Sequence, residues 1–470
     1  MLFNSMFTEV PVKKPYDKDP TGHRQIRDYH QMLEVLNHTF GSAPYWSDSA
    51  AAVGMVGVPM CAILDYPMGT ASGYAAFLDP EVNAHFKKIL NEWGKLLASP
   101  KSAEVLGTHK QGWFSEHGTN DMMHVANGPL GSNYNFDDFF ISPDPKGKHK
   151  GYKSWDDFFT VRAKLHNSTT HKSSTLLTIP KRQFKPEVRP VEFPDDDNVI
   201  NNCCESKTFA VQHNVKLRDH FWIKGQPYSV LDMLAHDPLS DSFAGGTVYQ
   251  AFLSALSYHR WHAPVSGTIK KCFVADGTYF SEPLFEGLGD PTVQEIDVGG
   301  ISVGQGYLAH LATRAIIFIE ADNPAIGLMA FIGIGMDEVS TCDITVKEGQ
   351  HVKKGEQTGM FHFGGSSHCL LFRKHVKVRD IKGYKPSLSE TSADLYPSFC
   401  RSRVSRSRGR ITMCRFAASW LRCRSNEPSV AGRVRDEAMF YGLFRIRRSS
   451  DSNDECRADL GCNTKVLDMK

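Results

Sequence analysis

The chain has 470 residues, of which 41% are hydrophobic, and its formal net charge at neutral pH is +2. A chain of this length can bury one large core or two to three ordinary ones. The 54 basic and 52 acidic residues nearly balance, so no overall field attracts nucleic acid or an anionic membrane. Composition therefore favours a globular protein, and we expect no nucleic-acid partner.

The N-terminal sequence has no apolar run of signal-peptide length after a basic region, and it carries acidic residues that a targeting helix would avoid. The most apolar window, residues 50–68, is interrupted by glycine, proline and aspartate, so we expect a buried helix and turn there. The eleven cysteines are scattered along the chain, which favours reduced thiols over a disulfide framework. These features predict a cytoplasmic protein without stable membrane insertion.

Residues 24–106 show apolar side chains at intervals of three and four, as in MLEVLNHTF and AHFKKILNEWGKLLA. This spacing is typical of amphipathic helices. After His109 the sequence becomes rich in Gly, Asn, Asp and Pro, which predicts loops and short elements leading to SWDDFF at 154–159. We therefore predict a helical N-terminal domain over residues 1–150.

Residues 207–344 have a different texture, with short apolar runs separated by Gly, Asp and Pro. These runs are FAVQHNV, FWIKGQPYSV, GTIKKCFV, GTYF, AIIFIEA, LMAFIGIG and DITV. Many short strands at such spacing predict a mostly antiparallel β domain. The expected fold class is α+β, with the helical region followed by a β domain over residues 151–384.

Two stretches do not fit this organisation. Residues 161–181 are rich in Ser and Thr without periodicity, which is typical of an inserted surface loop or of a segment foreign to the mature protein. Residues 385–470 contain basic Ser/Arg runs with little apolar patterning, and we expect a tail of low order. An RNA-binding tail is one interpretation; an aberrant C-terminus is the interpretation that we favour, because the composition shifts abruptly.

The segment MFHFGGSSHCLLF places Gly365 and Ser366 between two apolar runs. By itself this pattern indicates an ordinary turn, because glycine adopts backbone angles closed to other residues.

His259 and His262 bracket Arg260 and Trp261 just before a predicted strand. Two histidines three residues apart could hold a metal ion, but no acidic or thiol ligand stands at a recognised spacing, so we predict no metal site. Either they are hydrogen-bonded core residues, or one of them is the base for a distant serine. Tyr258 and Trp261 are expected to be packing residues.

Four segments occur in one order along the chain: SWDDFF, IKGQPYSVLDML, HRWHAPVSG and GGSS. Together they resemble the phosphatidylserine decarboxylase family from about residue 154 to residue 382, apart from the interruption at 161–181. The helical N-terminal region together with FIEADNPAIGL, STCDITVKEGQHV and GMFHFGGSS is similar to the soluble branch of that family, which decarboxylates free L-tryptophan.

This resemblance implies self-cleavage between Gly365 and Ser366. The Ser366 hydroxyl would attack the Gly365 carbonyl to give an ester, and β-elimination followed by hydrolysis would leave a covalent pyruvoyl group and ammonia. By resemblance, His262 is the base for this step. The family's orienting acid is an aspartate, and the stretch NNCCESKTF places Glu205 at the corresponding position.

The resemblance also implies the reaction of the mature enzyme. The pyruvoyl carbonyl would form a Schiff base with the substrate amine and act as electron sink, and His259 would protonate the resulting carbanion. No diffusible organic cofactor is needed. The implied activity is decarboxylation of an aromatic L-amino acid, with L-tryptophan to tryptamine first, by two self-derived chains that remain associated.

Four alternatives stay open. Phosphatidylserine could be the substrate, giving phosphatidylethanolamine, with peripheral binding to lipid. Ser366 and His262 could instead form a serine hydrolase. The chain could also be a binding protein or an inactive homologue that never matures, because the family's C-terminal sequence is not recognisable beyond about Tyr384.

Relatives lack a counterpart of residues 161–181, so this segment is expected to be an intron translated in frame.

Overall fold

A computed structural model describes eight parts of the chain: residues 2–128, 131–160, 188–219, 228–284, 304–362, 366–378, 401–405 and 410–413. The segment 161–181, Gly365 and most of the tail from 385 onward lie outside the described residues. The described ranges do contain the predicted site residues Glu205, His259, His262 and Ser366.

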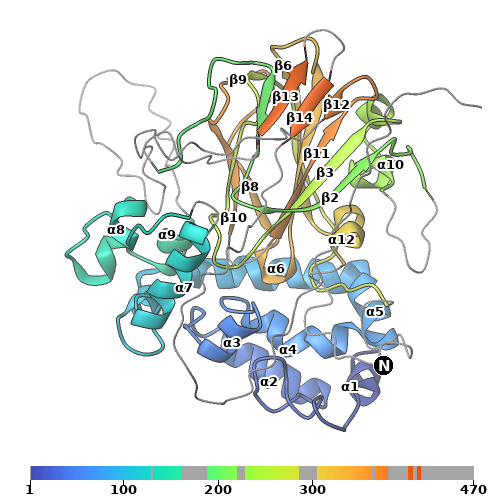
Figure 1. The fold of residues 1–470 in the computed structure, drawn as a ribbon. Coiled ribbons are helices and arrows are strands. Elements are labelled where there is room, and N and C mark those ends of the chain that lie inside the picture. Colours follow the sequence, from blue (N-terminus) through green and yellow to red (C-terminus); the bar gives the residue numbers. More distant parts are fainter. Residues whose placement is uncertain are drawn as a thin grey trace, which may run out of the picture. The chain divides into compact units, whose positions relative to one another are not determined.

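The N-terminal part of the chain is helical, as the apolar spacing predicted, and Figure 1 shows it in blue to teal. Its elements are α1 (Leu2–Glu9), α2 (Tyr29–Thr39), α3 (Asp48–Ala52), α4 (Pro59–Met68), α5 (Ala71–Leu78), α6 (Pro80–Leu97), η1 (Pro100–Leu106), α7 (Glu116–Asn127), α8 (Phe136–Phe139), η3 (Lys148–Gly151) and α9 (Trp155–Phe159). Within the described ranges, none of the helices combines the length and apolar character that crossing a bilayer would require.

Helix α6 shows how the sequence sets these elements. The Asp79 carboxylate accepts hydrogen bonds from the Glu81 and Val82 amides at its N-terminus, and Pro80 occupies the first turn, where its missing N–H costs nothing. One stripe of the helix is buried, comprising Asn83, Phe86, Leu90, Trp93 and Leu97. Burying such a stripe stabilises the helix more than its intrinsic propensity does.

The C-terminal part is built of strands, in green to orange in Figure 1. They are β1 (Val199–Asn201), β2 (Lys207–His213), β3 (Thr247–Leu253), β4 (Arg260–His262), β5 (Gly267–Ala275), β6 (Arg314–Ala321), β7 (Leu328–Ile334), β8 (Thr341–Ile344), β9 (His351–Val352), β10 (Gln357–His362), β11 (Ser366–Phe372), β12 (Lys377–Val378), β13 (Arg401–Ser405) and β14 (Arg410–Met413). Between them lie the helical turns α10 (Val230–Met233), η4 (Pro238–Phe243), α12 (Gln305–Leu311) and η5 (Asp337–Val339).

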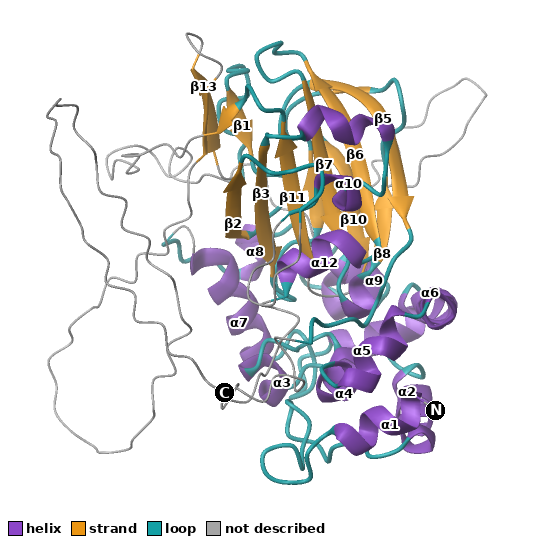
Figure 2. Cartoon of the chain, turned by 90° about the vertical axis from the view of Figure 1, so that its right-hand side faces the viewer, coloured by secondary structure: helices purple, strands orange, loops and turns teal. Residues whose placement is uncertain are grey.

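Among the described residues the strands form three sheets. The largest has the order β2-β3-β11-β7-β6-β5-β9, the second β4-β10-β8, and the third β1-β13-β14-β12. All pairings in the seven-stranded and three-stranded sheets are antiparallel, so the predicted α+β class is confirmed. The seven-stranded sheet and the nearby helices α10 and α12 are seen in Figure 2.

Some elements differ from the sequence-based expectation. The apolar run at 221–230 was counted among the strands, but residues 220–227 are outside the described residues and Val230 begins helix α10. The predicted strand at 277–280 is only an isolated bridge between Thr278 and Ala312. Strands β13 and β14 lie in the tail, where no apolar pattern predicted order.

The helical part contacts the sheets through hydrogen bonds as well as apolar packing. Glu338 follows β7, and its carboxylate accepts from the Met60 amide at 2.8 Å and the Cys61 amide at 3.1 Å. These amides belong to the first turn of α4, where Val58 supplies no side-chain cap. Burial raises the pKa of Glu338 to about 7. A residue of η5, between β7 and β8, thus caps a helix of the N-terminal region.

We predict that Glu338→Ala lowers the free energy of unfolding by about 2–3 kcal/mol, because two buried amides lose their acceptor. Thermal or urea unfolding of the purified protein measures the change. The matched control is Glu92→Ala, which removes an exposed carboxylate paired with Lys95 and should change stability by less than about 0.5 kcal/mol. Equal effects of the two changes would contradict the capping role of Glu338.

Candidate functional site

The predicted cleavage site lies where the chain passes from one sheet to another. Strand β10 ends at His362 in the three-stranded sheet, and β11 begins at Ser366 in the middle of the seven-stranded sheet. Only residues 363–365, outside the described residues, connect the two strands. The serine that resemblance assigns as nucleophile is therefore the first residue of a central strand.

Strand β11 turns its two adjacent serines to opposite faces of the sheet. Successive side chains of a strand alternate between faces, so Ser366 shares a face with His368, while Ser367 shares the other with Cys369. Ser366 lies opposite Leu253 of β3, and Ser367 lies opposite Ile334 of β7.

The Ser367 hydroxyl lies within a buried hydrogen-bond network. The Gln250 amide nitrogen donates to the Ser367 hydroxyl oxygen at 3.3 Å and to the Gln305 carbonyl at 2.9 Å. The Tyr228 hydroxyl donates to the Gln250 side-chain oxygen at 2.6 Å. Tyr228 belongs to the segment KGxxYS, which the sequence singled out without indicating a role. This network ties the Ser367 face of β11 to α12.

The Ser366 hydroxyl is buried on the other face. Its side chain is fully shielded from solvent, and within the described parts of the chain its oxygen has no hydrogen-bond partner. That face is covered by Trp261 of β4, whose ring packs 5.2 Å from the ring of Phe331 on β7. An unpaired hydroxyl in a dry site is unusual and suits a group reserved for chemistry.

His259 lies at the end of β10 that leads toward Ser366. Its carbonyl accepts from the Phe361 amide at 3.0 Å, and its buried ring stacks on Phe159 of the SWDDFF helix with 4.7 Å between ring centres. The structure thus brings two of the motifs together at the side of the link between the sheets.

His262 lies nearer the other end of β10, opposite Gln357. Its Nδ1 is 2.8 Å from the Gly355 carbonyl; since a carbonyl only accepts, Nδ1 carries the proton and Nε2 keeps its lone pair in the neutral ring. Burial lowers the pKa of His262 to about 4. The imidazole is therefore neutral at physiological pH, which is the form that a general base needs.

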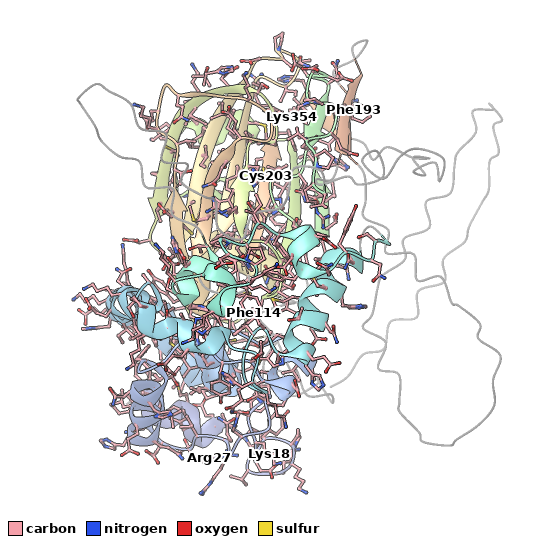
Figure 3. The ribbon with its side chains drawn as sticks, turned by 90° about the vertical axis from the view of Figure 1, so that its left-hand side faces the viewer. Lys18, Arg27, Phe114, Phe193, Cys203 and Lys354 are labelled. Atoms are coloured by element: carbon pink, nitrogen blue, oxygen red, sulfur yellow. The ribbon has the colours of Figure 1, made fainter. Side chains whose placement is uncertain are left out.

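Glu205 forms an ion pair with Arg189. The Arg189 Nε donates to Oε1 of Glu205 at 3.2 Å, and Arg189 also donates to the Ala126 carbonyl at 2.9 Å. The turn that carries Glu205 does reach the histidine strand, because the His262 amide donates to the Cys203 carbonyl at 2.9 Å. Figure 3 shows Cys203 among the strands. An orienting contact from Glu205 to His262 stays a prediction.

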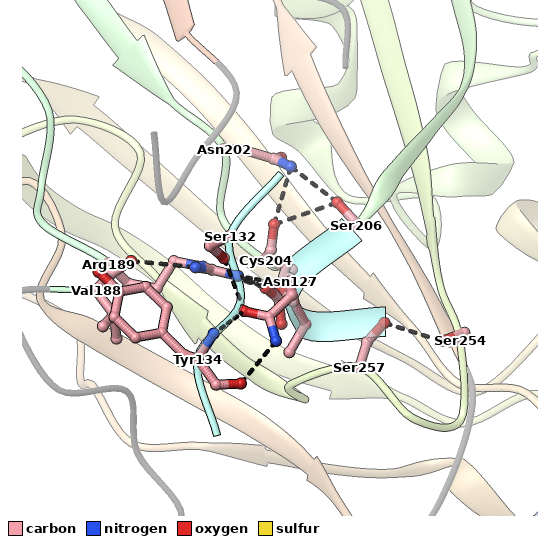
Figure 4. Close-up of polar contacts among 12 residues, drawn as sticks. Asn127, Ser132, Tyr134, Val188, Arg189, Asn202, Cys204, Ser206, Ser254 and Ser257 are labelled. Atoms are coloured by element: carbon pink, nitrogen blue, oxygen red, sulfur yellow. Dashed lines mark hydrogen bonds and ion pairs between the residues drawn. The ribbon is translucent and has the colours of Figure 1, made fainter. Parts of the chain in front are cut away.

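His368 is a buried histidine for which the sequence motifs indicated no role. Its Nε2 is 2.9 Å from the Asn202 side-chain oxygen, and the Asn202 amide nitrogen donates to the Cys204 carbonyl and the Ser206 hydroxyl (Figure 4). Asn202 therefore offers an acceptor, so Nε2 of His368 carries the proton. Burial lowers the pKa of His368 to about 3. The sequence did contain a signal for it, because a residue two positions after Ser366 in a strand lies on the same face of the sheet.

His362 is a second histidine for which the motifs indicated no role. Its Nδ1 donates to Oδ1 of Asp156 at 2.8 Å, and its Nε2 lies 3.6 Å from a carboxylate oxygen of Asp343 on β8. Asp156 belongs to the SWDDFF helix. The sequence could not indicate this pair, because its members are 206 residues apart.

No group of three or more potential metal ligands comes together among the described residues. A hollow of about 690 Å³ lies along α7 and residues 131–136. Its lining includes none of the predicted site residues.

The helical part, the antiparallel sheets and the Gly-Gly-Ser-Ser link between two strands can be compared with known proteins. Two family models, both described as phosphatidylserine decarboxylase, match residues 1–122 and 178–393. The decarboxylase iboD of Amanita muscaria is 41% identical over 345 residues, spanning 69% of this chain and 90% of that protein.

L-tryptophan decarboxylases of Psilocybe cubensis and Psilocybe cyanescens are 34% and 37% identical. The matches cover 78% and 74% of this chain, and 80% and 73% of those proteins. Further matches are named phosphatidylserine decarboxylase proenzymes. These relatives and family models define the class of protein as a decarboxylase, a carboxy-lyase. The chain belongs to the phosphatidylserine decarboxylase family.

We predict that Gly359→Ala disrupts the packing of the three-stranded sheet, both within it and against the seven-stranded sheet. An added Cβ at Gly359 would lie 2.4 Å from Trp261 and 2.5 Å from the Asp343 carbonyl oxygen. Because the backbone of β8 cannot yield, we expect a loss of about 1–3 kcal/mol in unfolding free energy, measured by thermal unfolding. Gly128→Ala is the control, since Gly128 is helical and an added Cβ there meets nothing within 4 Å; an equal loss in the control would refute the argument.

Proposed function

We propose that this decarboxylase cuts its own chain between Gly365 and Ser366 and turns Ser366 into a covalent pyruvoyl group. The observation that carries the proposal is the contrast between the two adjacent serines. The Ser367 hydroxyl is bound by Gln250, whereas the buried Ser366 hydroxyl is unpaired within the described residues. The proenzyme names of several relatives support the same conclusion.

The proposed chemistry of maturation requires the Ser366 hydroxyl to meet His262, to which it makes no hydrogen bond among the described residues. A serine hydroxyl becomes a nucleophile when a base takes its proton, and the Nε2 lone pair of the neutral His262 imidazole is suited to this task. The new bond joins the Ser366 oxygen to the Gly365 carbonyl carbon, and the amide bond between the two residues breaks. Glu205 is proposed to orient His262 once its own pairing with Arg189 allows the contact.

In the mature enzyme, the pyruvoyl group supplies a conjugated carbonyl that takes up the electron pair released with carbon dioxide. His259 is proposed to deliver the proton that replaces the carboxyl group. Its stacking on Phe159 fixes the plane of the imidazole and holds it beside the end of β10.

The two chains produced by cleavage are proposed to remain associated. The smaller one would begin with β11, which pairs along its length with β3 on one side and β7 on the other. Its separation would break hydrogen bonds on both edges of a buried strand. The cut therefore changes the covalent chain while the sheet keeps its order.

The proposed substrate is a free aromatic L-amino acid, first of all L-tryptophan, which would give tryptamine. Two similar relatives, each matching about three quarters of this chain, are named L-tryptophan decarboxylases. The second candidate substrate is phosphatidylserine, which the names of the matching family models favour.

We predict that the purified wild-type protein consists of two fragments, the smaller one starting at position 366 with a hydrazine-reactive carbonyl. Ser366→Ala should abolish cleavage, because no other hydroxyl occupies that position. Ser367→Ala is the matched control and should still be cleaved, since its hydroxyl faces α12. Intact mass spectrometry distinguishes the fragments.

A single uncleaved wild-type chain would overturn the proposal and leave a non-maturing homologue or a binding protein. A serine hydrolase would keep one chain and lose ester hydrolysis on Ser366→Ala.

We predict that the cleaved enzyme releases carbon dioxide from L-tryptophan at a rate far above that from phosphatidylserine vesicles. The reason is that the relatives named L-tryptophan decarboxylase match most of this chain. Trapping of labelled carbon dioxide with each substrate in parallel measures the difference, and uncleaved Ser366→Ala protein serves as the blank. Faster release from the vesicles would assign the lipid as substrate.

A further inference from the structure

The last residue of β10 is clamped between two carboxylates from different parts of the chain. His362 donates from Nδ1 to Asp156 of α9 at 2.8 Å, and its Nε2 lies 3.6 Å from Asp343 of β8. His362 and Asp156 are both buried, and Asp343 is half-buried. Burial alone would lower the pKa of His362, but hydrogen bonds and charges from both carboxylates outweigh it and raise the pKa to about 9.

Other polar and charged groups surround His362, Asp156 and Asp343. The Thr160 hydroxyl donates to Oδ1 of Asp156 at 2.6 Å and lies 3.4 Å from Nδ1 of His362. Arg260 of β4 interacts electrostatically with both carboxylates, while burial lowers its pKa, and its guanidinium donates to the Gln357 side chain. His259 lies close to the end of β10, because its carbonyl accepts a hydrogen bond from the Phe361 amide, and Tyr258 interacts electrostatically with Arg260.

The clamp joins three segments at one end of β10. Helix α9 carries Asp156, strand β8 carries Asp343, and His362 is the last described residue before the link that ends at Ser366. A buried ion pair of this kind specifies a geometry, because a shifted partner leaves a charge unpaired in a dry site. The clamp thus fixes the end of β10, three residues before Gly365 in the sequence, while the pairing of β11 fixes Ser366.

We propose that His362, held between Asp156 and Asp343, is a positioning residue for self-cleavage: it fixes the end of β10, three residues before the bond between Gly365 and Ser366. This inference rests on the proposed function. His362 does not touch the reacting atoms in this scheme. His362 acts by fixing the end of strand β10, which precedes the bond to be cut.

Cell-free synthesis of the precursor, followed by intact mass over time, tests the proposal. His362→Gln and Asp156→Asn should each slow cleavage by about tenfold or more, because small displacements of reacting groups are costly. The double variant should be no slower than the slower single variant, since both changes break the same contact. The control is His351→Gln, which removes an exposed pair with Asp322 and should leave the rate unchanged.

The pH profile separates positioning from general stabilisation. The wild-type cleavage rate should fall as pH rises through about 9. There His362 loses its proton, and the two carboxylates no longer have a positive charge between them. His362→Gln should lack this alkaline fall, because glutamine does not titrate. Thermal unfolding of the same variants in the uncleavable Ser366→Ala background should show folded precursors.

Folded His362→Gln that is cleaved at the wild-type rate overturns the inference. So does an unfolded His362→Gln precursor, because the clamp would then be a general element of stability. Absence of cleavage in both the wild type and His351→Gln contradicts the proposed function itself. If only the inference about His362 fails, the wild type and His351→Gln are still cleaved.

Discussion

The pairing of β11 on both of its edges is the constraint on which the rest of the structure depends. A strand in the middle of a sheet has a fixed register, and a shift by one residue would exchange its two faces. For this strand such a shift would exchange Ser366 with Ser367. The antiparallel ladders to β3 and β7 therefore decide which hydroxyl is bound by Gln250 and which has no partner among the described residues.

The site also depends on contacts that join distant segments. The SWDDFF helix contributes Phe159, which stacks on His259, and Asp156, which binds His362. The fully buried Trp261 packs between the three-stranded and seven-stranded sheets, against Phe331. These contacts give a closely packed region around Ser366, in which electrostatic interactions are stronger than they would be in water.

Much of this arrangement could be predicted from the sequence, and the limits have physical reasons. Apolar periodicity indicated the helices and most strands, and the order of the motifs indicated Ser366, His259 and His262. Periodicity says nothing about pairs of charged residues far apart in the chain, so the partners of His362 and Glu205 were not found. The burial that lowers the pKa of His262 and His368 depends on tertiary packing, which a local pattern does not contain.

The central position of β11 in the sheet has a consequence for the order of synthesis and proposed cleavage. If residues 1–365 were made without the remainder, β3 and β7 would flank a slot one strand wide, with unpaired backbone groups on both sides. Such a slot is a template for strand addition and for exchange between copies. Biosynthesis as one polypeptide avoids this hazard, because the strand that fills the slot arrives tethered to it, and the proposed cleavage would cut the tether only after the slot is closed.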